Sequence, residues 1–189
     1  SLVGSEMCIR DRPGDTASHY KYLTQDATAT LVHSLVISRL DSMNSLLIGQ
    51  PDNVISKLQK IQNHAAKVVV KKRKHDHVTP ILQLLHWLPI AYRIQYKLIL
   101  TTHKCLHDKA PEYLSSRLEK YVTGRTLRSA DQHLLVEGKA KLKSYGERAF
   151  SVAAPKLWNQ VSLDLRRCGN LHTFKSKLKT FLFKKAFNV

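Results

Sequence analysis

The sequence predicts an all-α protein, an array of antiparallel helices with an irregular middle. Two observations favour this class: apolar residues recur at the helical period over several long segments, and prolines stand where such segments begin. The apolar fraction of 43% is ordinary for a globular domain, so we expect a buried core. Gly and Pro are too few for a low-complexity chain.

The first two helical segments are expected to form an antiparallel pair. Asp26 or Thr28 can cap the first, and Gly49 and Pro51 end it because glycine permits a left-handed cap and proline cannot continue a helix. Pro51 then begins the second helix. The expected apolar face of the first helix is Leu31, Leu35, Val36, Leu40, Met43, Leu46 and Leu47; that of the second is Val54, Ile55, Leu58, Ile61, Ala65 and Val68.

Proline begins three further expected helices, at Pro80, Pro89 and Pro111. The helix that follows Pro89 is the longest of them. Its expected buried residues are Ile90, Ile94, Leu98, Thr101 or Thr102, and Cys105.

Helical periodicity breaks over residues 121–144, which predicts a loop with room for one short strand at 134–136. It returns over residues 145–161, interrupted at Pro155, and again over 171–187. The expected apolar face of the last helix is Leu171, Phe174, Leu178, Leu182 and Phe183.

We therefore divide the chain into four regions: residues 1–20, a helical region at 21–120, an irregular connector at 121–144, and a basic helical region at 145–189. Residues 1–20 are expected to be artefactual or disordered. Residues 1–12 resemble a translated library-adapter sequence and do not inform the fold. The chain starts at Ser1 rather than Met, so we expect a fragment.

A formal net charge of +17 is the most unusual property of the composition. Such an excess of Lys and Arg predicts a polyanionic partner, with nucleic acid as the first candidate and an anionic membrane surface as the second. From Lys139 onward, twelve Lys and Arg residues stand against Glu147 and Asp164. A second focus lies at residues 67–74.

We expect the following residues to contact nucleic-acid phosphates: Lys67, Lys71, Lys72, Arg73, Lys74, Arg125, Arg128, Arg148, Lys175, Lys177 and Lys179. The alternative for each group is an ordinary solvated surface, and a basic amphipathic helix at the C-terminus can also lie on anionic lipid. Trp87 and Trp158 can stack on bases, although their apolar neighbours favour core packing.

Other chemistry finds little support in the sequence. Cys8, Cys105 and Cys168 are scattered, which indicates free thiols in a reducing compartment, nuclear or cytoplasmic. His64, His75 and His77, or His103, Cys105 and His107, lack the paired spacing of a structural zinc site. No apolar run reaches the roughly 18 residues of a membrane span. We expect no metal or cofactor.

Several motifs occur in a fixed order along residues 21–187. They are SRLD (38–41), NSLL (44–47), KLQKIQN (57–63), DHVTP (76–80), LHWLP (85–89), RI (93–94), APEYL (110–114), LRS (127–129), GERAF (146–150), AAPKLWN (153–159) and the basic run 174–183. Together they resemble the region that follows the reverse-transcriptase palm in polyproteins of LINE-type (non-LTR) retrotransposons, which are transposable elements.

The resemblance implies thumb-like and C-terminal helices of an RNA-directed DNA polymerase, whose partners are RNA or DNA and the remainder of the polyprotein. A polymerase needs paired carboxylates that hold two Mg²⁺ ions, and this sequence contains no Asp-Asp pair. Asp41 is a single carboxylate within a helical pattern, expected to be a surface or hydrogen-bonding residue. We therefore expect no enzyme activity and no small-molecule substrate.

The leading hypothesis is a non-catalytic fragment that binds template or target nucleic acid through backbone charge, with low sequence selectivity. Two alternatives remain open. One is a helical protein-interaction module whose basic face meets an acidic partner, and the other is a functionless remnant of a degraded mobile element.

Overall fold

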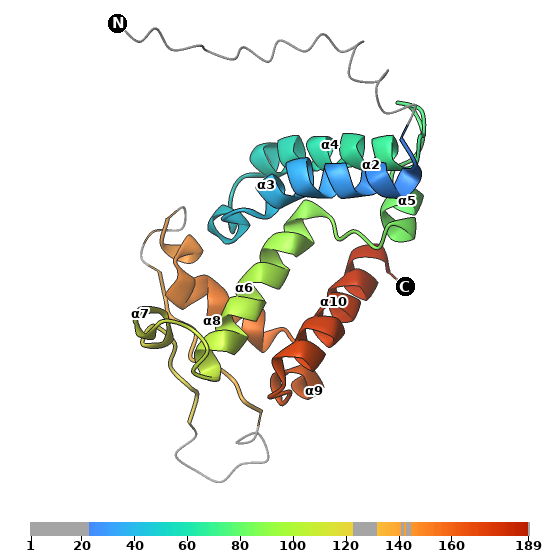
Figure 1. Ribbon diagram of the computed structural model, residues 1–189. Helices are drawn as coiled ribbons and strands as arrows, with labels where there is room; N and C mark the ends of the chain where they lie inside the picture. Colours follow the sequence, from blue (N-terminus) through green and yellow to red (C-terminus); the bar gives the residue numbers. More distant parts are fainter. Residues whose placement is uncertain (1–22, 123–131, 141, 143–144, 189) are drawn as a thin grey trace, which may run out of the picture.

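The computed structural model describes residues 23–122, 132–140, 142 and 145–188 (Figure 1). This part of the chain is mostly helical, as the sequence predicts, and it contains no strand. At the expected short strand, one antiparallel bridge joins Leu135 to Lys120. The suspected adapter-like residues lie outside the described part.

An antiparallel pair of helices forms the N-terminal layer, as predicted. The first helix consists of α2 (Gln25–Val32), a π-helical turn η2 (His33–Ile37) and α3 (Ser38–Asp41). Its N-cap is Thr24, whose hydroxyl accepts the N–H of Ala27, rather than Asp26 or Thr28. After the 3₁₀ turn η3 (Asn44–Leu47), α4 (Asp52–Val69) returns beside α2 (Figure 1).

The predicted buried face of the first helix is right for Val36 and Leu40, which pack against the core, and wrong for Leu31 and Leu35. Thr28, Val32 and Ile37 are buried, whereas Leu31 and Leu35 are exposed. A π turn adds one residue, so positions five apart fall on the same side of the helix. The periodic pattern of an uninterrupted α-helix therefore misses Ile37, which is buried five positions after Val32.

The buried face of α4 is displaced from the predicted one by a single position. Ala65 is buried as expected, but Ile61 and Val68 are exposed, and Gln62 and Val69 lie inside instead. The polar atoms of Gln62 have partners there, because its Nε2 donates to the carbonyl of Leu88 at 2.8 Å and its Oε1 accepts from Gln59.

The helices that begin at prolines are confirmed: α5 (Thr79–Leu84), α6 (Ile90–Leu106) and α7 (Glu112–Ser115). Helix α6 is central and contacts α4, α8 and α10 (Figure 1). Its buried residues include the predicted Ile90, Ile94, Leu98, Thr102 and Cys105.

Four helical elements form the C-terminal part: η4 (Gly146–Arg148), α8 (Phe150–Asn159), α9 (Leu163–Arg166) and α10 (Leu171–Phe187). The interruption expected at Pro155 is absent, because α8 continues through that buried residue. The bounds of α10 match the prediction, and Asn170 caps it by accepting the N–H groups of His172 and Thr173. Helices α6 and α10 run antiparallel (Figure 1).

The largest core cluster joins three of the predicted regions of the chain. Its buried members are Leu88, Ile99, Leu135, Trp158, Val161, Leu165, Phe174, Leu178 and Leu182. The preference for Trp158 as a core residue is confirmed, since its side chain is buried and its indole N–H donates to the carbonyl of His133.

Across the described residues, no helix has the length and apolar character that crossing a membrane requires.

Candidate nucleic-acid interface

The predicted basic cluster at residues 67–74 forms the end of α4 and the turn that follows it. The Lys71 ammonium donates to the carbonyl of Leu23 at 3.0 Å, and the Lys67 ammonium donates to the carbonyl of Lys74 at 2.5 Å. These two hydrogen bonds therefore hold the turn against the end of α4 and against the segment that precedes α2. The other predicted residues of the turn are exposed to solvent: Lys72, Arg73 and Lys74.

The three predicted lysines of α10 are exposed, but they do not share one face. Phe174, Leu178 and Leu182 are buried beneath the helix. At about 100° per residue, Lys175 and Lys179 lie on one flank of this buried face and Lys177 on the other. A single nucleic-acid strand along α10 would therefore meet Lys175 and Lys179 together.

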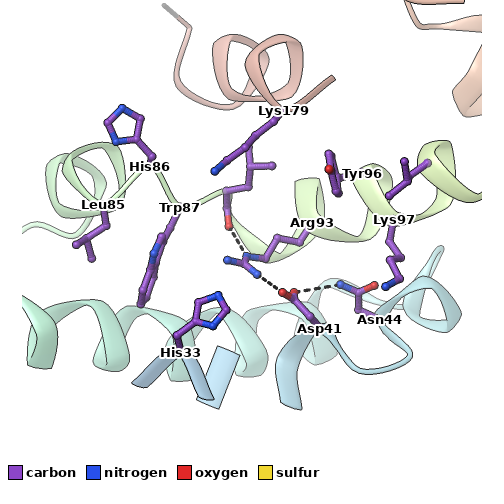
Figure 2. Close-up of a pocket in the computed structure, with 12 residues that line it drawn as sticks. His33, Asp41, Asn44, Leu85, His86, Trp87, Arg93, Tyr96, Lys97 and Lys179 are labelled. Carbon is purple, nitrogen blue, oxygen red and sulfur yellow. Dashed lines mark hydrogen bonds and ion pairs between the residues drawn. The ribbon is translucent and has the colours of Figure 1, made fainter. Parts of the chain in front are cut away.

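Lys179 lines a groove of about 390 Å³ (Figure 2). Helix α10 contributes Lys179, helix α6 contributes Arg93, Tyr96 and Lys97, and the N-terminal pair lies on the opposite side (Figure 2). The complete lining is His33, Asp41, Asn44, Leu85, His86, Trp87, Leu88, Arg93, Tyr96, Lys97, Leu100 and Lys179. We call it the α6–α10 groove.

Cations outnumber carboxylates in the α6–α10 groove. Arg93, Lys97 and Lys179 stand against Asp41 alone among its lining residues. Lys97 and Lys179 are exposed, so their ammonium groups are accessible to a ligand. Exposed ammonium groups of this kind can contact an anion such as phosphate.

Aromatic rings accompany these cations. Trp87 and Tyr96 are half-buried, while His33 and His86 are exposed. Burial raises the pKa of Tyr96, so its hydroxyl keeps its proton at neutral pH and can donate a hydrogen bond. Rings beside ammonium groups are the combination that single-strand binders use to hold bases and phosphates.

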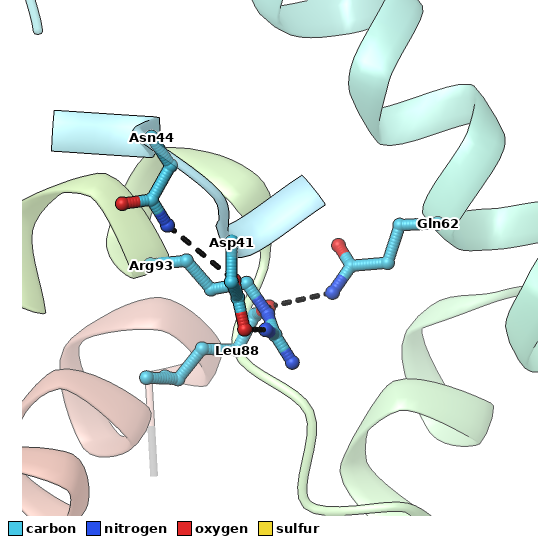
Figure 3. Close-up of polar contacts among 5 residues, drawn as sticks. All are labelled: Asp41, Asn44, Gln62, Leu88 and Arg93. Atoms are coloured by element: carbon cyan, nitrogen blue, oxygen red, sulfur yellow. Dashed lines mark hydrogen bonds and ion pairs between the residues drawn. The ribbon is translucent and has the colours of Figure 1, made fainter. Parts of the chain in front are cut away.

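A polar network fixes the floor of the groove (Figure 3). Arg93 Nη1 contacts Asp41 Oδ2 at 2.5 Å, and Arg93 Nε donates to the Leu88 carbonyl at 3.1 Å. Asn44 donates to Asp41, and Gln62 donates to the same Leu88 carbonyl. Asp41 is thus a hydrogen-bonding residue, as expected, and its partner Arg93 is 52 positions away.

Other predicted residues lie elsewhere. Arg148 is half-buried, with its guanidinium 5.9 Å from the Tyr145 ring centroid and its side chain against Gly49. It lines a separate cavity beside Leu46 and Phe150. Arg125 and Arg128 lie outside the described residues. Of the described candidates, the structure therefore brings Lys179 alone into the α6–α10 groove.

The groove residues Arg93, Lys97, Tyr96 and His33 were not among the sequence candidates. Arg93 belongs to a motif, and Lys97 follows it by one helical turn on the flank of the face that buries Ile94 and Leu98. Amphipathic spacing could have identified Lys97 as a surface residue, whereas the Arg93 side chain is mostly buried. It gives no indication that α10 lies beside that surface.

The histidine and cysteine candidates have structural roles in α6. His103 is fully buried, donates from Nε2 to the Cys168 carbonyl at 2.7 Å, and stacks on Phe174. Burial raises the pKa of the Cys105 thiol, which disfavours the thiolate. Within the described ranges, no three His, Cys, Asp or Glu residues are grouped so that they could hold a metal ion.

Scans against protein-family models, curated proteins and solved structures each found no match to the chain.

Proposed function

We propose that this chain is a non-catalytic, helical C-terminal segment of a LINE-type reverse transcriptase that binds RNA or DNA through its phosphate backbone. The observation that carries this proposal is the α6–α10 groove, where the exposed cations Lys97 and Lys179 stand beside Trp87 and Tyr96. The net charge of +17 extends the attraction beyond the groove.

In this proposal, phosphates contact the ammonium groups of Lys97 and Lys179 while an unpaired base lies against Trp87 or Tyr96. Ammonium groups act as point charges and do not read base edges, and ring stacking tolerates every base. Binding is therefore expected to show little sequence selectivity and to weaken as salt rises.

The motifs that carry the resemblance support the assignment of the chain to a LINE-type reverse transcriptase. Asp41, Gln62, Leu88 and Arg93 come from four separate motifs and meet in one hydrogen-bonded network. A shared need for that network is a physical reason for these residues to occur together. As thumb-like helices, the segment would hold template or target near the palm of the remaining polyprotein.

The direct test is equilibrium binding of the chain to a labelled RNA hairpin and a DNA duplex at salt concentrations from about 50 to 300 mM. Circular dichroism on the same samples reports whether the helices are formed. A folded chain whose affinity falls steeply with salt supports the proposal. A folded chain that binds neither ligand refutes it, and an unfolded chain favours the functionless remnant.

A helical protein-interaction module is the second candidate, and exposed apolar side chains favour it. Leu31 and Leu35 on the first helix, and Ile61 and Val68 on α4, are exposed on the paired N-terminal helices. Excess tRNA distinguishes the two functions. It should displace the chain from labelled DNA if phosphate binding is the function, and it should leave an apolar protein contact intact.

A further inference from the structure

A second cavity, of about 370 Å³, lies beside the irregular connector, and none of its lining residues lines the α6–α10 groove. It is formed where the end of α6, two extended segments, α8 and α9 meet. Its lining comprises Leu106, His107, Lys120, Tyr121, Val122, His133, Leu134, Leu135, Trp158, Arg166 and Arg167. We call it the Arg166 pocket.

Arg166 is the unusual residue of this pocket. Its side chain is buried, with a residue exposure of 9%, and its Nε and Nη1 atoms have no hydrogen-bond partner. Burial lowers the pKa of Arg166, yet a guanidinium keeps its proton at neutral pH. The fold therefore holds a desolvated positive charge that nothing on the described chain neutralises. Buried charges in proteins are normally paired.

The rest of the lining reinforces this charge. Lys120 is a further cation of the lining, and no Asp or Glu is among the lining residues described. Tyr121, Val122 and Leu134 supply an aromatic and apolar wall beside the cations. Such a pocket suits a ligand with a compact anionic group attached to an organic body.

The pocket is held open by hydrogen bonds that do not involve Arg166. The Trp158 indole donates to the His133 carbonyl at 2.8 Å, and Tyr121 N–H donates to the Leu134 carbonyl at 3.0 Å. These bonds fix both extended segments against α8. A ligand would thus enter a largely preformed site and lose little free energy in ordering it.

We infer that the Arg166 pocket binds the terminal phosphate of a nucleic-acid strand. A phosphomonoester carries close to two negative charges at neutral pH, whereas an internal phosphodiester carries one, so a strand end matches the cationic lining better. The guanidinium charge is delocalised, so an anion in the pocket compensates the charge of the whole group although Nε and Nη1 are themselves buried. Tyr121 and Leu134 would then contact the terminal sugar or base. This inference rests on the proposed function.

The test compares strands that differ only in a terminal phosphate. Short single-stranded RNAs with a 5′-phosphate, a 3′-phosphate or hydroxyls at both ends are titrated with the full chain, with AMP as a competitor. One charge-assisted contact predicts that a terminal phosphate tightens binding about tenfold. Strong competition by AMP at low concentration would indicate that a free nucleotide, rather than a strand end, is the source of the phosphate.

Two matched variants test whether Arg166 causes the preference for a phosphorylated strand end. Arg166→Met should abolish the preference for a phosphorylated end, and it should not lower the melting temperature of the free protein, since a buried unpaired cation contributes little stability. Arg39→Met removes the same charge from an exposed position on α3 and should preserve the preference.

The outcomes separate this inference from the proposed function. Equal affinity for phosphorylated and unphosphorylated strands overturns the terminal-phosphate site and leaves backbone binding intact. A preference that survives Arg166→Met also overturns it. If AMP binds in an Arg166-dependent manner and no strand binds, the pocket binds a free nucleotide and the proposed function fails. If neither AMP nor any strand binds, both fail.

Discussion

The side-chain amide of Asn159 pairs with the backbone of Leu135 as a neighbouring strand would. Asn159 Oδ1 accepts the Leu135 N–H at 3.0 Å, and Asn159 Nδ2 donates to the Leu135 carbonyl at 3.0 Å. Leu135 is buried in the main core, so its backbone groups need partners. Helix α8 thereby anchors the irregular segment that also forms the wall of the Arg166 pocket.

Asn159→Asp should destabilise the protein by about 1–3 kcal/mol, because a carboxylate can accept the Leu135 N–H but cannot donate to its carbonyl. It would also place a second carboxylate beside Glu137, which now accepts from the Asn159 amide. Urea unfolding measures the loss. Gln160→Glu adds the same charge at an exposed neighbour and should change stability little; equal losses in both variants would show that charge, not pairing, is responsible.

Asp41→Asn should destabilise the protein by about 1 kcal/mol, since the Asp41 side chain is partly exposed and solvent screens its ion pair with Arg93. The neutral amide weakens the bond to a guanidinium that is itself mostly buried. Asp108→Asn, at an exposed site, is the control. Equal melting temperatures for the two variants would show that the ion pair between Asp41 and Arg93 does not stabilise the fold.

Acid should destabilise the fold through His103. Burial lowers the pKa of His103, its bond to the Cys168 carbonyl partly opposes this, and His107 and Lys109 lower the pKa further. The unfolded chain therefore binds a proton more readily than the folded one. Stability from this group is complete above a pH of about 6.5 and decreases as the pH falls below it.

Denaturant titrations between about pH 7.5 and pH 5 measure this effect. His103→Gln has a neutral amide that can still donate to the Cys168 carbonyl, so it should reduce the decrease in stability over that range. An unchanged pH dependence in His103→Gln would show that other groups cause the acid sensitivity.

Helix positions that depend on local chemistry could be predicted from the sequence. Pro51, Pro89 and Pro111 each precede a helix as expected, and the expected bounds of α10 match those observed. These signals act through backbone geometry within a few residues, so the surrounding fold does not alter them.

Buried faces were harder to predict where a single residue changes the register. The π turn at His33–Ile37 buries Ile37 and exposes Leu35, although both are apolar. Gln62 is buried because the Leu88 carbonyl, 26 positions away, accepts from it. Neither fact has a local sequence signal, since one is a change in helical winding and the other a tertiary contact.

The candidate site was predictable by residue type but not by arrangement. The basic residues at 71–74 and on α10 are exposed, as a phosphate-binding surface requires, whereas Lys67 is half-buried. That Lys179 shares a groove with Lys97 depends on the packing of α10 beside α6. Arg166 likewise differs from Arg167 in burial, which a pair of adjacent arginines does not reveal.

The salt dependence of DNA binding by a groove variant tests most directly whether the α6–α10 groove binds phosphates. Lys97→Gln with Lys179→Gln removes both exposed ammonium groups of the α6–α10 groove. Lys57→Gln with Lys60→Gln removes the same charge from exposed positions on α4 and is the matched control.

Duplex binding is measured for the wild type and both variants over about 50 to 300 mM salt. We predict that the slope of log K against log salt becomes shallower by about 1.8 in the groove variant, 0.9 for each lost phosphate contact, and changes much less in the control. Equal changes in both variants, or a wild-type chain that binds without salt dependence, would contradict the account.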